Sequence, residues 1–205
     1  MGWFSTSPHQ TYRLYGWSSS KNAGSGNDKL YGYSVYQNKL WGGSGNDLVY
    51  GWGSKNYLYG GSGNDTVKAW GAYNRLYGDS GHDKLYGYGA YNYLNGGNNN
   101  DQLRGYGAKN DLYGGHHNDS LYGYGATNKL DGGTGHDKLY GYGGTNHMYG
   151  QSGNDHMEGR GAWNHMDGGS GNDRMIGIGA YNQMYGGSGN DRIEAKGVVN
   201  KAYGG

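Results

Sequence analysis

Single apolar positions recur along this chain every nine residues, with one spacing of ten near the start. Each is an aliphatic residue or methionine flanked by polar or aromatic residues. The series is Leu30, Leu40, Val49, Leu58, Val67, Leu76, Leu85, Leu94, Leu103, Leu112, Leu121, Leu130, Leu139, Met148, Met157, Met166, Met175, Met184, Ile193 and Ala202. A spacing of nine does not keep one face of an α-helix apolar, and frequent glycine disfavours helices. Segments such as Leu48-Val49-Tyr50, with the middle side chain inward, instead predict short strands separated by turns.

Two polar residue types mark opposite ends of the repeat. The aspartates, called here the Asp ladder, are Asp28, Asp47, Asp65, Asp83, Asp101, Asp119, Asp137, Asp155, Asp173 and Asp191. The asparagines, called the Asn ladder, are Asn38, Asn56, Asn74, Asn92, Asn110, Asn128, Asn146, Asn164, Asn182 and Asn200. Two turns and two short strands then close one coil, and such coils stack about 4.8 Å apart. We predict an all-β fold, a parallel β-solenoid (β-roll) of about ten 18-residue coils with two short strands per coil.

The pattern also predicts where the repeat begins. Residues 1–23 break it and include Trp3, Phe4 and Trp17, so we expect an N-terminal capping segment there. Residues 24–205 are the expected solenoid repeat domain. The chain stops at Gly205, at the start of a new turn, which favours a longer array or stacking on another copy.

Composition narrows the class of protein. The chain has 205 residues, 47 of them glycine, a single proline and no cysteine, and glycine does not recur every third residue, which excludes collagen. A formal net charge of +1 predicts no general attraction to nucleic acid or anionic membrane. Apolar runs are too short for a membrane span. We find no Ser–His–Asp set, paired carboxylates or phosphate loop outside the repeat, and we predict a non-catalytic protein.

The two ladders differ in what they require. Stacked asparagine amides bond to one another and to the backbone without any charge. Carboxylates stacked about 4.8 Å apart repel by roughly 1 kcal/mol per pair even in water, and lysine and arginine are absent from these turns. Calcium, held by carboxylate and glycine carbonyl oxygens, is the cofactor this ligand set favours. The alternative is a hydrogen-bonded Asp ladder without metal.

The Asp turns carry a family resemblance. Gly43-Ser44-Gly45-Asn46-Asp47-Leu48-Val49 and its copies resemble the RTX nonapeptide repeat, G-G-x-G-x-D-x-U-x, from Gly24 to Ala202. The resemblance implies an extracellular β-roll with calcium at the Asp turns. The Asn half-coils depart from the family motif, which implies calcium on one edge alone. Turns 96–101 and 114–119 lack the second turn glycine, and we expect them to be distorted.

Short polar side chains form two columns beside the Asp ladder. The Ser column also contains Asn98, His116 and Thr134, and the surface Asn column also contains His82 and His136. The candidate ice-binding residues are Ser25, Asn27, Ser44, Asn46, Ser62, Asn64, Ser80, Thr134, Ser152, Asn154, Ser170, Asn172, Ser188 and Asn190. The array resembles the ice-binding RTX module of a bacterial adhesin, although this chain has serine where that module has threonine and is interrupted at His116 and His117.

Ice binding is therefore the specific function we predict, with ice or further copies of the chain as partner. A self-assembling fibre or an extracellular adhesion module is the alternative, and serine, glycine and asparagine are also simply good turn residues. Nothing in the sequence selects a carbohydrate. Aromatic columns, such as Tyr88, Tyr106 and Tyr124, are predicted to stack and stabilise the coils, and such a surface also invites lateral assembly or a second ice face. His147 and His165 share a column, which we interpret as coincidence rather than a metal site.

Overall fold

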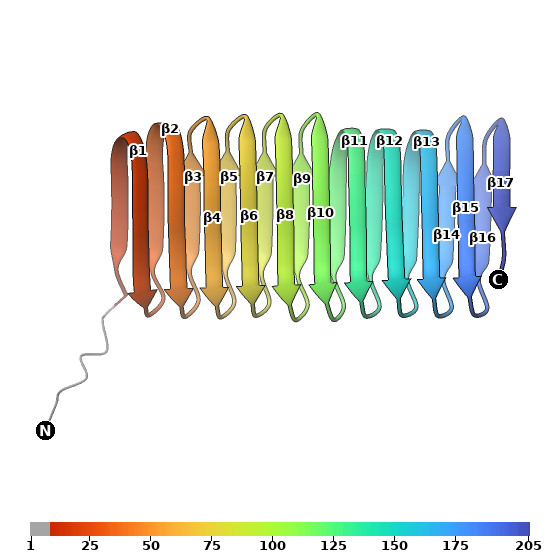
Figure 1. The fold of residues 1–205 in the computed structure, drawn as a ribbon, viewed down its shortest axis with the longest axis horizontal. Helices are drawn as coiled ribbons and strands as arrows, with labels where there is room; N and C mark the ends of the chain where they lie inside the picture. The colour runs from red at the N-terminus through yellow and green to blue at the C-terminus, as the bar shows by residue number, and fades with distance from the viewer. Residues whose placement is uncertain (1–8) are drawn as a thin grey trace, which may run out of the picture.

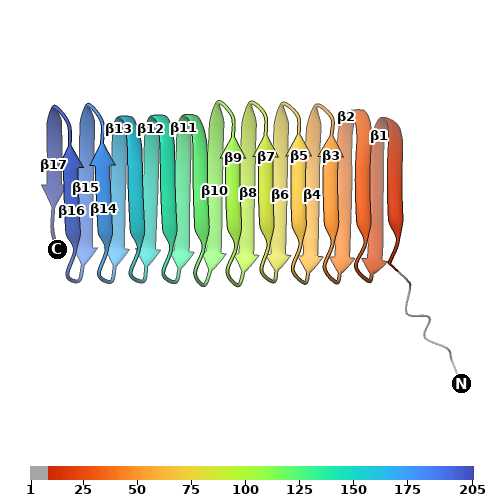
Figure 2. The same ribbon diagram turned by 180° about the vertical axis from the view of Figure 1, so that it is seen from behind.

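The computed structural model describes residues 9–205 and shows a rod of stacked coils (Figures 1 and 2). The strands are β1 (Thr11–Ser25), β2 (Lys29–Ser44), β3 (Leu48–Trp52), β4 (Lys55–Ser62), β5 (Thr66–Trp70), β6 (Tyr73–Ser80), β7 (Lys84–Tyr88), β8 (Tyr91–Asn98), β9 (Gln102–Tyr106), β10 (Lys109–His116), β11 (Ser120–Thr134), β12 (Lys138–Ser152), β13 (His156–Ser170), β14 (Arg174–Ile178), β15 (Tyr181–Ser188), β16 (Arg192–Lys196) and β17 (Val199–Tyr203). Across residues 9–205, no helix is long and apolar enough to cross a membrane.

Each coil has a short-strand face and a long-strand face. In one coil, β3 lies on the short-strand face and β4 on the long-strand face, and both pair in parallel with their equivalents one coil on. Strands β2, β11, β12 and β13 continue around the corner between the two faces. The Asp turns form the lower edge in Figure 1 and the Asn turns form the upper edge. The prediction of a parallel β-solenoid is confirmed.

The core is a single file of side chains between the two faces. All predicted core residues from Leu30 to Met184 are completely buried, and Ala69 joins them. The file changes from mostly leucine to methionine at Met148, which conserves the apolar character of the interior. Ile193 is half-buried and Ala202 is exposed, because both lie in the last coil.

The first coil lies earlier in the chain than the repeat pattern indicated. Strand β1 pairs in parallel with β2, from Thr11 opposite Lys29 to Ser25 opposite Ser44, with one register shift after Gly16. The solenoid therefore begins ahead of the boundary expected at residue 24, and it has about 11 turns. Trp3 and Phe4 lie outside the described residues, so the expected capping role of the N-terminal segment stays a prediction.

Candidate functional site

The Asp ladder is buried and hydrogen-bonded along the rod. The side chains from Asp28 to Asp173 are at most 4% exposed, and Asp191 in the last coil is half-buried. Each backbone N–H of the ladder donates to Oδ1 of the aspartate one coil later; for example, Asp101 donates to Asp119 at 2.7 Å. The hydrogen-bonded ladder that was the alternative to a metal site is thus present in part, because one carboxylate oxygen per coil accepts a bond from the protein.

The second carboxylate oxygen of each aspartate, Oδ2, has a different environment from Oδ1. Within residues 9–205, Oδ2 of every aspartate in the Asp ladder is buried and lacks a hydrogen-bond partner. Glycine makes room for it: a Cβ added to Gly42 would overlap both Oδ2 of Asp47 and the carbonyl oxygen of Gly60 in the next coil. The same arrangement recurs at Gly78, Gly114 and other copies. Two oxygens therefore face one small space, an arrangement that a cation or a proton would stabilise.

Burial has the expected effect on these carboxyl groups. Burial raises the pKa of Asp65, Asp101 and Asp119 to about 8, opposed by the backbone N–H bond and reinforced by neighbouring aspartates. It raises the pKa of Asp83 and Asp137 to about 6, where nearby His82 and His136 oppose the rise. Without a bound cation, the raised pKa favours the protonated form of Asp65, Asp101 and Asp119 near neutral pH.

The residues of this edge fit calcium. A buried, unpartnered carboxylate oxygen and a glycine carbonyl oxygen in each coil are the hard donors that calcium takes, and it takes six to eight of them. In the part of the chain that the structure describes, no three His, Cys, Asp or Glu side chains converge on a point. One carboxylate per coil would leave backbone carbonyls and water as the remaining ligands. A bound ion would supply the positive charge that the stacked carboxylates require.

The two turns expected to be distorted differ from the other copies in local backbone conformation but keep the Asp ladder. Asn99 and His117 adopt φ angles of 77° and 76° where most copies have glycine at positive φ. Asp101 and Asp119, which follow them, remain in the buried ladder. Glycines at the equivalent position, such as Gly63 and Gly135, have φ angles of 122° and 128°, so the backbone of these two turns does differ locally, while the Asp ladder continues through them. Asparagine and histidine adopt the left-handed region more readily than most residues.

The Asn ladder is complete where the Asp ladder is not. Each Nδ2 donates to Oδ1 of the next asparagine, for example from Asn92 to Asn110 at 2.8 Å. The same Nδ2 of Asn92 also donates to the carbonyl oxygen of Tyr106 in the next coil. The first coil continues the pattern with a hydroxyl, because Ser19 Oγ donates to Oδ1 of Asn38. The amide supplies both donor and acceptor, so this edge needs no ion.

The candidate ice-binding residues form an ordered surface strip. All are exposed except Ser152, which is half-buried. In the surface Asn column, Oδ1 accepts the backbone N–H of the next coil, as from Asn64 to Asn46 at 2.7 Å. The histidines of this column make the same kind of bond as the asparagines: Nδ1 of His136 accepts the backbone N–H of Asn154 at 2.7 Å. The sequence signal for this role is the position they share with asparagine.

The predicted aromatic columns stack face to face. On the short-strand face, parallel rings lie 4.7–5.3 Å apart in an unbroken series. The series is Tyr15, Tyr33, Trp52, Trp70, Tyr88, Tyr106, Tyr124 and Tyr142. Such contacts stabilise neighbouring coils by about 0.5–1.5 kcal/mol each beyond the area they bury.

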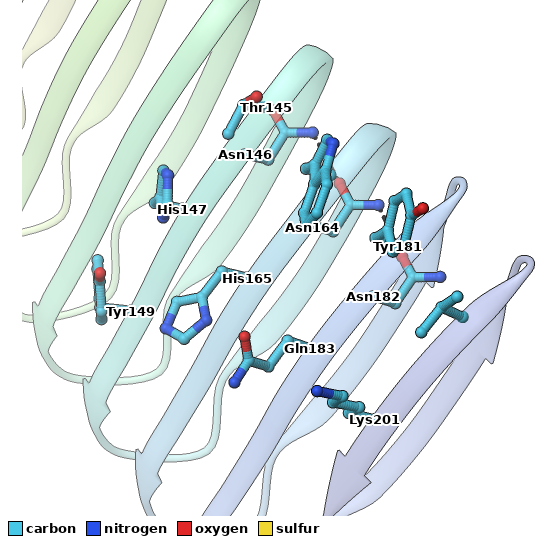
Figure 3. A pocket seen from close by; sticks show the side chains of 12 residues that line it. Thr145, Asn146, His147, Tyr149, Asn164, His165, Tyr181, Asn182, Gln183 and Lys201 are labelled. Atoms are coloured by element: carbon cyan, nitrogen blue, oxygen red, sulfur yellow. Dashed lines mark hydrogen bonds between the residues drawn. The ribbon is translucent and has the colours of Figure 1, made fainter.

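A groove of about 700 Å³ crosses β12, β13, β15 and β17 on the long-strand face (Figure 3). Its walls include the stacked pair Trp163 and Tyr181, with ring centroids 4.1 Å apart. His147 and His165 lie on adjacent coils in its floor, with centroids 5.9 Å apart. Burial lowers the pKa of His147. Within residues 9–205, no third His, Cys, Asp or Glu joins this pair in a group that could hold a metal ion.

A parallel β-solenoid with a buried carboxylate in each turn of one edge defines a class of repeat scaffold with cation-binding turns. The family model of the RTX calcium-binding nonapeptide repeat matches residues 22–34, 36–67 and, in overlapping copies, 73–197. The chain belongs to this family of calcium-binding repeats, whose members are typically secreted. No curated protein matches the chain.

Proposed function

We propose that this protein is an extracellular, calcium-stabilised β-solenoid whose Asp edge binds ice. The observation that carries the proposal is the surface Asn column, in which Oδ1 of each residue is fixed by the backbone of the next coil, as at Asn154 and Asn172. Rows about 4.8 Å apart along the rod, and about two residues (~7 Å) apart across it, then hold polar groups on a rigid, nearly flat grid. Ordered groups at a fixed spacing organise water without first losing side-chain entropy.

Calcium belongs to the same proposal. The carboxylates of the Asp ladder and the glycine carbonyl oxygens beside them would hold the ions, with charge neutralisation as the main effect. The Asp turns and the Ser column adjoin in sequence, as in Ser44 to Asp47. An edge stiffened by ions is therefore also the edge that presents the grid.

Thermal hysteresis and ice-crystal shape test the ice-binding proposal. Ser170→Tyr places a ring on the strip, and Ala162→Tyr places the same ring at an exposed position on the Asn edge. We expect wild type and Ala162→Tyr to shape ice and Ser170→Tyr to lose most of the hysteresis. Ice crystals that grow without shaping in concentrated wild-type protein would contradict the proposal. Filaments in electron micrographs of the same sample would then favour the self-assembling fibre.

Extracellular adhesion is the second candidate function. It is favoured by the uneven distribution of charge over the rod, which places ten of the 17 lysines and arginines on the short-strand face, beside the Asp edge and not on the ice-binding strip itself. The chemistry of that face does not depend on ice.

A further inference from the structure

The short-strand face carries a line of cations along its margin next to the Asp edge. The outward residue that begins each short strand is basic at Lys29, Lys84, Lys138, Arg174 and Arg192, and all five are exposed. The remaining members of that column, such as Thr66 and Gln102, are uncharged. The margin therefore has positive charge without compensating negative charge in the same column.

Further cations lie between the tyrosines of the middle column. Lys68 lies over the rings of Tyr50 and Tyr86, at 5.5 and 4.9 Å from their centroids. Arg104 lies in the same way over Tyr86 and Tyr122. Cation–π contacts of this kind hold a charged group at a fixed place on the surface. These cations are therefore ordered in the plane of the sheet.

The acidic residues of this face are few and paired. Glu158 and Glu194 lie on it, and each is bonded to the cation two residues later, Arg160 at 2.5 Å and Lys196 at 2.7 Å. Arg13 in the first coil brings the basic residues of the face to ten, against two acidic ones. Nearly every coil thus adds one cation, at a coil spacing of about 4.8 Å.

The net charge of the whole sequence does not reflect the excess of positive charge on the outer surface. The chain has 17 basic and 16 acidic residues, but ten of the acidic ones form the Asp ladder inside the turns. Outside the ladder, 17 − 6 leaves an excess of 11 positive charges. The expectation that +1 implies no attraction to polyanions therefore holds for the whole chain but not for its outer surface.

The aromatic column beside these cations limits what the face can bind. Its rings stack along the rod axis with interplanar angles of 2–13°, so each inner ring has both faces covered by its neighbours. The edges and hydroxyl groups of the tyrosines are left for a partner. Single-stranded nucleic acid is bound by stacking bases on exposed ring faces, and this column does not offer them. Hydroxyl groups beside cations instead suit a ligand with hydroxyls and anions in alternation.

We propose that the short-strand face binds an acidic polysaccharide, with its carboxylates on the lysines and arginines and its hydroxyls on the tyrosine hydroxyls. A polyuronate carries one carboxylate per sugar ring, so its charges recur on a length scale comparable to the coil spacing. Burial and neighbouring tyrosines raise the pKa of Tyr88 and Tyr124, so these hydroxyls remain donors at neutral pH. The inference is independent of ice binding, because it concerns a different surface.

Two triple variants with equal change in net charge test the proposal. One is Lys84→Gln/Lys138→Gln/Arg174→Gln on the short-strand face, and its control is Lys39→Gln/Lys55→Gln/Lys109→Gln on the long-strand face. Affinity for an oligogalacturonate is measured by titration calorimetry at low salt and one fixed free-calcium concentration. Melting curves verify that both variants fold. We expect roughly tenfold weaker binding or more in the first variant, from three lost ion pairs, and less than about twofold in the control.

Each alternative result overturns the proposal. Equal losses in the two variants would mean attraction to net charge rather than to this face. Equal affinity for a neutral glucan of the same length would remove the role of the carboxylates. Tighter binding of single-stranded DNA or of anionic lipid vesicles at the same salt, lost in the first variant, would assign the face to that polyanion instead.

Discussion

The two edges of the solenoid bury ladders of nearly identical side chains with different consequences. On the Asn edge, the amide of Asn110 both accepts from Asn92 and donates to Asn128, so the ladder continues by itself. On the Asp edge, Oδ1 of Asp119 accepts the backbone N–H of Asp101, and within the described chain Oδ2 has no partner. Exchanging an NH₂ group for an oxygen atom thus turns a self-sufficient edge into one that needs a cation. The difference concerns donors, because size and burial are the same.

Removal of calcium is the strongest test of this contrast. Each site saturated at about 100 times its Kd adds about 2.7 kcal/mol, so several sites lost together should lower the Tm by at least about 10 °C. Differential scanning calorimetry with EDTA, followed by added calcium, measures the effect. Magnesium is the control, because its strict octahedral geometry suits a carbonyl-rich turn poorly. An unchanged Tm would leave the Asp edge as independent of metal as the Asn edge.

The pH dependence of the calcium-free protein comes next in size. The folded state holds protons on Asp65, Asp101 and Asp119 up to about pH 8, whereas the unfolded chain releases them near 4. The folded state therefore binds more protons between these values, and its stability falls as the pH rises through that range. In EDTA we expect a Tm several degrees higher at pH 5 than at pH 8.

A variant with His82→Asn and His136→Asn provides the control for that experiment, since it replaces the imidazole side chains of the surface Asn column with the asparagine found in the other coils. The pH trend should persist in this background. A Tm that rises with pH in EDTA would show that the buried carboxyl groups are ionised and stabilised by something other than protons.

Placing a carboxylate on the Asn edge should remove a hydrogen-bond donor and so create there the deficit seen on the Asp edge. Asn128→Asp loses the bonds from Nδ2 to Asn146 and to the carbonyl oxygen of Tyr142. We expect a loss of about 2–4 kcal/mol in the free energy of unfolding, measured by urea denaturation at pH 8. Asn95→Asp, at a half-buried position on the long-strand face, is the matched control and should change stability by less than about 0.5 kcal/mol. Equal effects would mean that the ladder contributes little.

The reverse exchange, from aspartate to asparagine on the Asp edge, has the smallest expected effect on stability. The sign of that effect should depend on calcium. Asp119→Asn removes a carboxylate from the Asp ladder while keeping its size. In EDTA at pH 8 it should stabilise the protein by about 1 kcal/mol, because it removes a buried carboxyl group that must either keep a proton or carry an unpaired charge. With calcium present it should destabilise by a similar amount, because one ligand is lost. The same sign in both buffers would contradict a role for Asp119 in holding the ion.

The sequence predicts the solenoid well because its order is periodic. A residue such as Leu76 is buried whenever its equivalents are, so the register, the core and the aromatic stacking all follow from one repeat. The first coil escapes the pattern because Gln10 and Ser19 stand where later coils have Asp and Asn. The direction of each carboxylate could not be predicted, because spacing does not determine which oxygen meets a donor. The sequence places His136 in the surface Asn column, but the bond that its Nδ1 accepts from Asn154 had to come from the structure.

The constant separation of 18 residues between partners has a consequence for how such a protein varies in length. Most ladder bonds join a residue to its equivalent one coil away, as from Asp65 to Asp83 and from Asn74 to Asn92. A whole coil can therefore be added or removed without new kinds of contact. Each added coil lengthens the ion-holding edge, the polar grid and the basic face by the same step. Since weak contacts on one rigid body combine as avidity, coil number sets the binding strength of every surface at once.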